Sequence, residues 1–213
     1  MAKCDNISMS VIRRLPRYYR FLCELDNQNI ERISSNKLAE IMHVTASQVR
    51  QDLNCFGGFG QQGYGYAVKQ LKDEITKILG LNQNHPAILL GAGNLGKAVV
   101  AHMNFKRLGF NLVGIFDKDK KIIGTEINGI LIRGDEDIES FVKDNKVDSA
   151  FLCLPKNGVE EIISRLYKIG IKSFWNFSHY DISNNFEDTI VENVHLSDSL
   201  MTLCYRMNEN NDT

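Results

Sequence analysis

The sequence predicts a chain of two domains, a small helical domain followed by an α/β domain built on a parallel sheet. Early in the chain, apolar side chains recur every three or four positions, which is the period of an amphipathic helix. Later, apolar runs alternate with helix-like segments, which is the rhythm of a doubly wound sheet. A glycine-rich turn follows the first of those runs. We therefore expect domains at residues 1–80 and 87–194, a polar linker at 81–86, and a C-terminal helix and tail at 195–213.

Composition limits the classes of protein to which the chain can belong. Apolar residues make up 43% and charged residues 24%, as in globular domains. No apolar run approaches the roughly 20 residues that span a bilayer, and residues 1–10 contain no apolar signal core. The five cysteines are scattered without a Cys-x-x-Cys pair, which indicates a reducing compartment and argues against a metal site. We expect a cytoplasmic protein with no metal and no membrane segment.

Three helices are expected at the start of the first domain. The first covers residues 8–26, and Pro16 should kink or weaken it because proline lacks the amide that continues a helix. Ser34 or Ser35 can cap a second helix. Residues 45–48 read Thr-Ala-Ser-Gln, the pattern of a capping box, so a third helix begins there. The short connection between the last two helices indicates a helix-turn-helix.

The helix-turn-helix pattern favours DNA binding, although a helical dimerisation domain with solvated arginines is an alternative. In this layout the later helix enters the major groove, where arginine can bind guanine and glutamine can bind adenine. A glycine- and aromatic-rich segment at 56–66 has the composition of a hairpin wing, and a helix is expected at 67–80. Residues 1–80 carry 11 Lys and Arg against 8 Asp and Glu, a basic excess that suits phosphate contacts. The expected DNA contacts are Arg13, Arg14, Arg17, Thr45, Ser47, Gln48, Arg50, Gln51, Gln61, Gln62 and Tyr64.

The second domain has the pattern of a Rossmann-type, dinucleotide-binding sheet. Strands are expected at 87–91, 111–116, 127–132, 148–154 and 171–176, and helices at 94–106, 135–145 and 157–169. In the Gly-x-Gly-x-x-Gly turn, Gly91 allows the tight turn and Gly93 lets the backbone approach a diphosphate. Gly96 permits the helix to pack closely on the strand.

Asp117 follows the second apolar run and is placed to accept hydrogen bonds from ribose hydroxyls. An acid there favours NAD(H) over its 2′-phosphorylated form, although the adjacent Lys118 weakens that inference. A Rossmann-like domain that binds coenzyme A is the main alternative. Residues near the carboxyl ends of later strands should border the nicotinamide. The expected cofactor contacts are Gly91, Ala92, Gly93, Asn94, Leu95, Gly96, Asp117, Lys118, Cys153, Leu154, Pro155, Asn176 and Phe177.

The sequence offers few candidates for catalysis. His102, His179 and His195 could in principle act as acids, but none stands in a nucleophile or proton-relay motif. An NAD-dependent oxidoreductase with an accessory helical domain is therefore the weaker interpretation, and we expect no enzyme activity. After a strand at 189–194, an apolar stripe at helical spacing indicates a last helix. That helix could complete its own domain or pack on a second subunit.

These features together resemble the Rex family of bacterial redox-sensing transcriptional repressors over nearly the whole chain. The resemblance implies a homodimer in which the C-terminal helices are exchanged between subunits. It implies that NAD+ permits binding to a palindromic operator, that NADH favours release, and that no reaction is catalysed. The controlled genes would serve fermentation, NADH reoxidation and anaerobic respiration. The segments that carry the resemblance are 11–20, 33–35, 48–53, 56–57, 63–66, 91–96, 116–117, 170–172, 175–177 and 191–194.

The chain departs from the family pattern at switch and DNA-reading positions. Where the family commonly has an acid that pairs with the arginine matching Arg20, this chain has His195. His102 aligns with a tyrosine near the nicotinamide, and Gln51 and Gln62 replace residues that are often basic, so DNA affinity or sequence preference should differ. Arg20, His102 and His195 are the expected switch residues. The histidines raise the hypothesis of pH-modulated sensing, whereas a different latch in this branch is the simpler interpretation.

Overall fold

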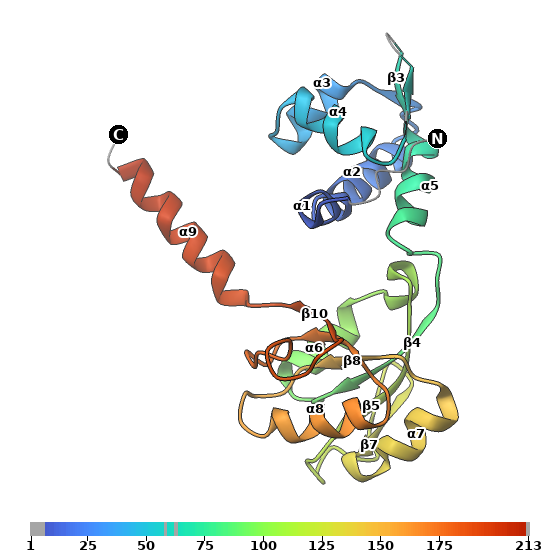
Figure 1. The fold of residues 1–213 in the computed structure, drawn as a ribbon, viewed down its shortest axis with the longest axis vertical. Helices are drawn as coiled ribbons and strands as arrows, with labels where there is room; N and C mark the ends of the chain where they lie inside the picture. Colours follow the sequence, from blue (N-terminus) through green and yellow to red (C-terminus); the bar gives the residue numbers. More distant parts are fainter. Residues whose placement is uncertain (1–6, 58, 62–63, 212–213) are drawn as a thin grey trace. The chain divides into compact units, whose positions relative to one another are not determined.

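A computed structural model describes residues 7–57, 59–61 and 64–211. The chain divides into two compact units, Met1–Asn82 and Gln83–Thr213, and the helices and strands of each are drawn in Figure 1. Within the described ranges, no helix combines the length and the apolar character that are needed to cross a membrane.

The first unit combines helices with a small antiparallel sheet. The strand order is β1-β3-β2, and β2 and β3 form the hairpin that the glycine-rich segment predicts. Strand β1, which pairs with β3, was not predicted. The elements are α1 (Met9–Ile12), α2 (Leu15–Asn27), β1 (Arg32–Ile33), α3 (Ser35–Met42), α4 (Ala46–Asn54), β2 (Gly60–Gln61), β3 (Gly65–Ala67) and α5 (Val68–Ile78).

The helix expected at 8–26 is two helices, because Arg13 and Arg14 form a turn that interrupts the α-helix. Pro16 then stands in the first turn of α2, where its missing amide costs nothing. In a continuous helix its ring would clash with the carbonyl of Ile12, four residues earlier. The break therefore has the cause that the sequence indicates, and it frees the residues at the junction to form other contacts.

The helix-turn-helix is formed by α3 and α4. The Ser34 hydroxyl accepts a hydrogen bond from the Lys37 amide, and the Thr45 hydroxyl accepts one from the Gln48 amide, both at 3.1 Å. These caps satisfy amides that would otherwise lack a partner at the helix starts. The reciprocal half of the predicted capping box is wrong, because the Gln48 side chain bonds to Asp52 instead.

The second unit is a seven-stranded sheet in the order β10-β9-β8-β4-β5-β7-β6. All neighbouring strands run parallel except β6 and β7. The single strand predicted at 127–132 is wrong: Asn128 and Gly129 both have positive φ and turn the chain between β6 and β7. The elements are β4 (His85–Leu90), α6 (Asn94–His102), the 3-10 helix η1 (Phe105–Leu108), β5 (Phe110–Asp117), β6 (Glu126–Ile127), β7 (Ile130–Gly134), η2 (Asp135–Asp137), α7 (Ile138–Asn145), β8 (Ser149–Leu152), α8 (Val159–Lys168), β9 (Ser173–Asn176), β10 (Ile190–Asn193) and α9 (Leu196–Asn211).

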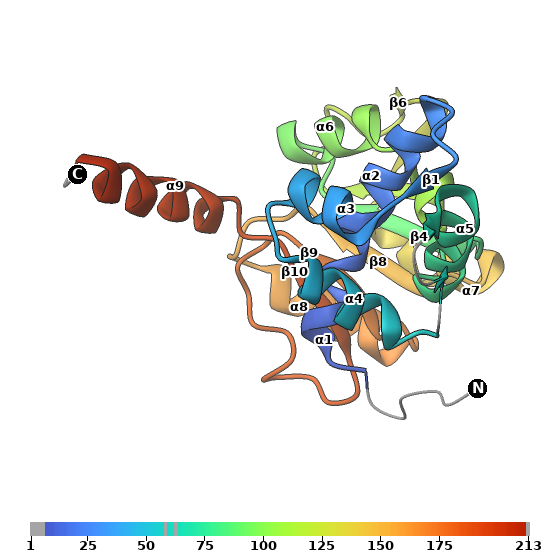
Figure 2. The same cartoon turned by 90° about the horizontal axis from the view of Figure 1, so that it is seen from above.

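Helices cover both faces of this sheet. Alternate residues of β4 point to opposite faces: Ile88 packs in a cluster with α7 and α8, whereas Leu89 packs in a cluster with Val100 of α6. Accordingly, α6 and α8 lie on opposite sides of the strands (Figure 2). The strand order reverses at β4, since β5 is added on one side of it and β8 on the other. In open α/β sheets, ligands bind at the carboxyl ends of strands at such a switch point.

Candidate functional sites

The glycine-rich turn joins β4 to α6 at the switch point of the sheet. Gly91 has a φ of +95°, and a Cβ there would lie 2.5 Å from the carbonyl oxygen of Cys153. A Cβ on Gly96 would overlap the carbonyl oxygen of Gly91. At Gly93, by contrast, a Cβ would meet nothing within 4 Å. Two glycines are therefore required by the fold, while the third faces open space, where a ligand's diphosphate could approach.

The start of α6 is exposed and suited to an anion. Gly93 is its N-cap residue, and no side chain caps the helix there. Gly93, Asn94 and Leu95 are exposed, whereas Gly91, Ala92 and Gly96 are buried beneath them. Uncapped amides and the helix dipole both favour a negatively charged group at this position.

Asp117 ends β5 beside the glycine-rich turn. Its carboxylate accepts a hydrogen bond from the Ala92 amide at 2.6 Å and one from the Asp119 amide at 2.8 Å. The side chain is half-buried, and the neighbouring Lys118 is exposed. Asp117 therefore lies beside the turn, its carboxylate is positioned by backbone donors from two directions, and its contact with a ribose stays a prediction.

A pocket connects these residues to the end of β8. Five of the predicted cofactor contacts line this pocket: Gly91, Asp117, Lys118, Leu154 and Pro155. Asp135, Asn157 and Val159 also line it, and sequence reasoning missed them. The position of Asp135 directly after a strand of the same parallel sheet was the available signal, since such strand ends meet at one edge.

Some of the residues predicted to border a nicotinamide ring line this pocket, and others do not. Leu154 and Pro155 line the pocket beside Gly91. Cys153 is half-buried, and burial raises the pKa of its thiol to about 12, so the thiol is neutral and unreactive at physiological pH. Phe177 is half-buried, and its ring packs against Trp175 with centroids 4.6 Å apart.

Asn176 belongs to the structure of the sheet rather than to the open pocket. It is fully buried. Its amide nitrogen donates to the Tyr180 carbonyl at 2.9 Å and to the Asn193 side chain at 2.7 Å. Its oxygen accepts from the Ser178 amide at 3.0 Å and from the Ser178 hydroxyl at 2.6 Å. All hydrogen-bonding groups of this amide are occupied within the protein, so its side chain stabilises this end of the sheet, and its place beside a nicotinamide stays a prediction.

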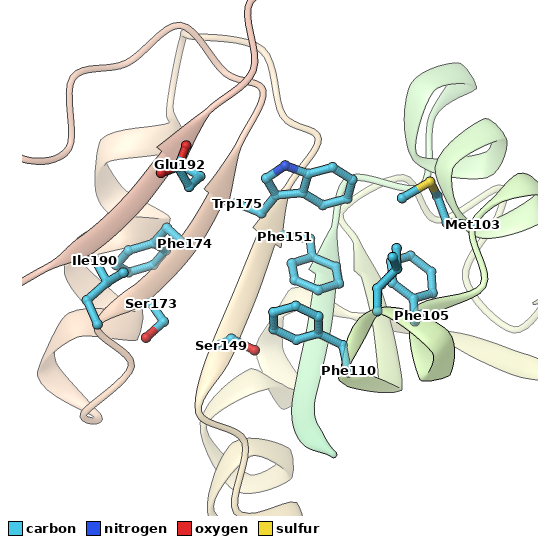
Figure 3. Close-up of a pocket in the computed structure, with 11 residues that line it drawn as sticks. Met103, Phe105, Phe110, Ser149, Phe151, Ser173, Phe174, Trp175, Ile190 and Glu192 are labelled. Carbon is cyan, nitrogen blue, oxygen red and sulfur yellow. The ribbon is translucent and has the colours of Figure 1, made fainter. Parts of the chain in front are cut away.

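A second cavity of about 300 Å³ lies against the sheet and is mostly apolar. Met103 and Phe105 lie on one side of it, Phe174 and Ile190 lie on the other, and the rings of Phe110, Phe151 and Trp175 stand between them (Figure 3). Among the described residues, its lining includes the hydroxyls of Ser149 and Ser173 but no basic side chain and no start of an α-helix that could bind a diphosphate. The pocket at the glycine-rich turn is therefore the better candidate for a dinucleotide.

The residues predicted to contact DNA lie on several elements of the first unit. Ser47, Arg50 and Gln51 of α4 are exposed, as are Arg13 and Arg17. A guanidinium nitrogen of Arg50 donates to the Ser35 hydroxyl at 3.1 Å.

The remaining predicted contacts are at the start of α4 and in the hairpin. Thr45 is exposed, but its hydroxyl caps α4. Tyr64 is exposed beside Arg32, which donates to its carbonyl at 3.1 Å. Gln61 pairs with Gly65 through its backbone, and Gln62 lies outside the described residues.

Two predicted DNA contacts are half-buried and bind a buried carboxylate. Arg14 donates to both carboxylate oxygens of the buried Asp52, at 2.7 and 2.6 Å. The Gln48 amide donates to the same carboxylate at 2.8 Å. Both side chains are held by a charge that sequence reasoning left unassigned, and their contact with DNA stays a prediction.

The predicted switch residues are at separate places in the two units. The guanidinium of Arg20 lies over the ring of Phe21, 5.5 Å from its centroid. His102 is exposed in the last turn of α6. The Nδ1 atom of His195 lies 2.8 Å from that of His179, so one ring donates a proton that the other accepts. His179 was not among the predicted switch residues.

Comparison with known proteins agrees with this arrangement. Residues 6–54 match a sequence family described as "Putative DNA-binding protein N-terminus", and residues 82–180 match one described as "CoA binding domain". The redox-sensing transcriptional repressor Rex of Thermoanaerobacter pseudethanolicus is 51% identical over 209 residues, which cover 98% of this chain and 93% of that protein. The chain belongs to the Rex family. The Rex repressor of Clostridioides difficile is 50% identical over 96% of this chain and 97% of its own.

Solved structures of Rex-family repressors have the same fold. A structure of RSP in complex with β-NAD+ and operator DNA matches with a TM-score of 0.88 and 50% identity, covering 97% of this chain and 94% of that chain. A structure of RSP in complex with β-NADH matches with a TM-score of 0.88 and 48% identity, covering 96% of both chains.

Proposed function

We propose that this chain is a redox-sensing transcriptional repressor that binds operator DNA and NAD(H). One observation carries the proposal: this chain, a member of the Rex family, has both a helix-turn-helix and a glycine-rich turn. Beside that turn, the Asp117 carboxylate lies 2.6 Å from the Ala92 amide. The relatives are named as transcriptional repressors, and relatives were crystallised with NAD+ and operator DNA and with NADH. The dinucleotide acts as the signal, and occupancy of the operator is the output.

The residues at the glycine-rich turn fit a dinucleotide. The exposed amides at the start of α6 would hold the diphosphate, and Asp117 would accept hydrogen bonds from the adenosine ribose. Leu154 and Pro155 would border the far end of the ligand. The contacts specific to Asp117 and to the pocket beside β8 are our proposal for how this chain recognises NAD(H).

The response to redox state follows from a population shift. NADH must bind the state that cannot bind DNA more tightly than the state that can, because a ligand shifts an equilibrium only by its difference in affinity. A high ratio of NADH to NAD+ then releases the operator. The genes so controlled would serve fermentation, NADH reoxidation and anaerobic respiration.

We also propose that the chain acts as a homodimer in which α9 packs on a second subunit. Leu196, Leu200 and Leu203 of α9 are more than half exposed in the single chain, at 64, 67 and 52%. A helix with an uncovered apolar stripe needs a partner surface. A palindromic operator presents two half-sites, which a twofold dimer matches.

The experiment that tests the function is a titration of operator DNA at several ratios of NADH to NAD+. We expect half-maximal release to move with the ratio at constant total dinucleotide. A variant with Gly93→Ala serves as a matched control, because it should keep DNA binding and lose the response. Binding that does not depend on the ratio in the wild-type protein would contradict the proposal.

A coenzyme A-binding regulator is the second candidate, because residues 82–180 match the family described as "CoA binding domain". Competition between NADH and coenzyme A for the purified protein separates the two. Displacement of NADH by micromolar coenzyme A would favour this alternative. An oxidoreductase would need to turn over a carbonyl substrate, which a steady decrease in NADH absorbance would reveal.

A further inference from the structure

The side chain of Asp52 is fully buried in the first unit. Its relative exposure is 0%, and it is the only buried acidic or basic side chain among those whose burial the structure describes. Asp52 is on α4, the helix expected to read DNA. An isolated carboxylate in such a place would be strongly destabilising. A buried charge on the recognition helix therefore requires a reason.

The carboxylate is satisfied by three side chains. Arg14 donates to both oxygens, at 2.7 and 2.6 Å, and Tyr18 donates its hydroxyl at 3.1 Å. Gln48 donates its amide at 2.8 Å from one turn earlier on the same helix. Burial alone would raise the pKa of Asp52, but these hydrogen bonds and the charge of Arg14 outweigh it and lower the pKa. The group is thus a carboxylate at neutral pH.

The network joins α2 and the residue before it to α4. Arg14 lies at the junction of α1 and α2, Tyr18 lies in the core on α2, and Gln48 and Asp52 lie on α4. The forked geometry of an arginine–carboxylate pair fixes direction as well as distance. A rotation of α4 about its own axis would break these bonds, so the network sets which residues of α4 face outward.

We propose that Asp52 is a positioning residue for DNA binding. It holds α4 in one rotation and withdraws Arg14 and Gln48 from the DNA, so that base recognition by α4 falls on Ser47, Arg50 and Gln51. These three side chains are exposed, whereas Gln48 is half-buried and Asp52 is buried. The inference deepens the proposed function and rests on operator binding by this chain.

Removal of the Asp52 charge should change operator affinity in opposite directions, depending on whether Asp52 acts only through its charge or positions α4. An Asp52→Asn variant loses one negative charge, so electrostatics alone would tighten binding to DNA phosphates. If Asp52 positions α4, the same variant binds the operator at least about tenfold more weakly, while NADH affinity is unchanged. Asp73→Asn is the matched control, because Asp73 is an exposed acid of the same unit, and it should not weaken binding. Tighter or unchanged operator binding by Asp52→Asn would overturn the proposal.

A double variant distinguishes a loss of stability from a loss of the orientation of α4. Arg14→Met with Asp52→Leu replaces the ion pair by apolar side chains, which often preserves stability. We expect thermal unfolding near that of the wild type but no recovery of operator affinity. Recovery of both stability and affinity would show that Asp52 only stabilises the unit, and would overturn the positioning role.

The division of base recognition is tested by Gln48→Ala against Gln51→Ala. Each variant is titrated with a set of operators that carry single base-pair changes. Gln48→Ala should weaken all operators by a similar factor, because it only loosens the Asp52 network. Gln51→Ala should abolish discrimination at one base pair, where a lost contact is worth about tenfold. A base-specific loss from Gln48→Ala would contradict the inference.

If the wild-type chain binds no operator at any ratio of NADH to NAD+, the proposed function fails rather than the role of Asp52. If the wild type binds and responds to NADH while the Asp52→Asn variant binds equally well, only the positioning role fails.

Discussion

At the scale of single residues, the three glycines of the turn differ in what they do, and this difference is measurable. Gly93→Ala should leave the unfolding free energy within about 0.5 kcal/mol of the wild type, because a Cβ there meets nothing within 4 Å. It should nonetheless weaken NADH binding, since we propose that the diphosphate approaches through that open space. Gly96→Ala should destabilise the fold by about 1–3 kcal/mol or more, because its Cβ overlaps the Gly91 carbonyl.

Thermal unfolding and NADH titration of the two variants check this prediction. The informative pattern is a stable Gly93→Ala protein with poor NADH affinity beside an unstable Gly96→Ala protein. Equal NADH affinity in Gly93→Ala and wild type would place the diphosphate elsewhere.

Asp117 carries the second prediction at this scale. Asp117→Asn should lower NADH affinity about tenfold, because a charge-assisted hydrogen bond to the ribose is replaced by a neutral one. It should weaken NADPH binding less, because the carboxylate that repels the 2′-phosphate is gone and Lys118 remains. Fluorescence titration with both cofactors measures the ratio of affinities. Asp144→Asn is the control, because Asp144 is an exposed acid of the same unit outside the pocket, and an unchanged ratio in Asp117→Asn would argue against a ribose contact.

Local sequence pattern was sufficient for some site residues and insufficient for others. The roles of Gly91 and Gly96 depend on a turn defined by adjacent residues, so their spacing predicts them. The hydrogen bond of Gln48 with Asp52 has the i, i+4 spacing of a helix and was open to prediction. The contacts of Arg14 and Asn176 were not, because partners of these two residues come from other parts of the fold. Arg14 meets Asp52, 38 positions away in sequence, and Asn176 meets Asn193, 17 positions away. No spacing rule reports such contacts.

At the scale of elements, periodicity identifies helices and parallel strands well but misses short irregular ones. The break between α1 and α2 follows from Pro16, and α4 begins at its cap. The β6–β7 hairpin was predicted as one strand, because its turn at Asn128 and Gly129 interrupts an apolar run only briefly. Strand β1 has only two residues, too few for a period to show.

The contact between α2 and α4 gives a prediction about acid stability. The folded state lowers the pKa of Asp52 below the ordinary value of 3.8, so folding favours the carboxylate. That stabilisation is complete above the unfolded value and disappears as the pH falls through the lower folded value. Asp52→Asn should therefore cost about 2–3 kcal/mol at neutral pH, and the difference from wild type should shrink below about pH 4.

Denaturant unfolding of the wild type and Asp52→Asn between pH 3 and 7 measures this difference. Asp73→Asn, which removes an exposed acid, should show no such dependence. A difference between wild type and Asp52→Asn that is constant with pH would mean that charge is not what Asp52 contributes.

At the scale of the whole molecule, the sequence pattern predicts two units, and the structure divides the chain at Asn82 and Gln83. What a single chain leaves uncovered is the apolar stripe of α9, and a dimer would cover it. Leu200→Glu with Leu203→Glu should convert the protein to a monomer, because each leucine contributes about 1.5–3 kcal/mol when fully buried and a charge there adds a penalty. Operator affinity should fall with it, since one subunit contacts only one half-site.

Analytical ultracentrifugation and operator titration test this prediction together. Thr202→Glu is the matched control, because by helical spacing Thr202 lies opposite the stripe of Leu196, Leu200 and Leu203, and it should stay dimeric. NADH binding by the monomer then decides whether each pocket is complete within one chain. A monomer with wild-type NADH affinity places all required contacts in the pocket between Gly91 and Pro155, whereas a loss assigns part of the site to the second subunit. A double variant that remains dimeric would mean that α9 is not the dimer contact.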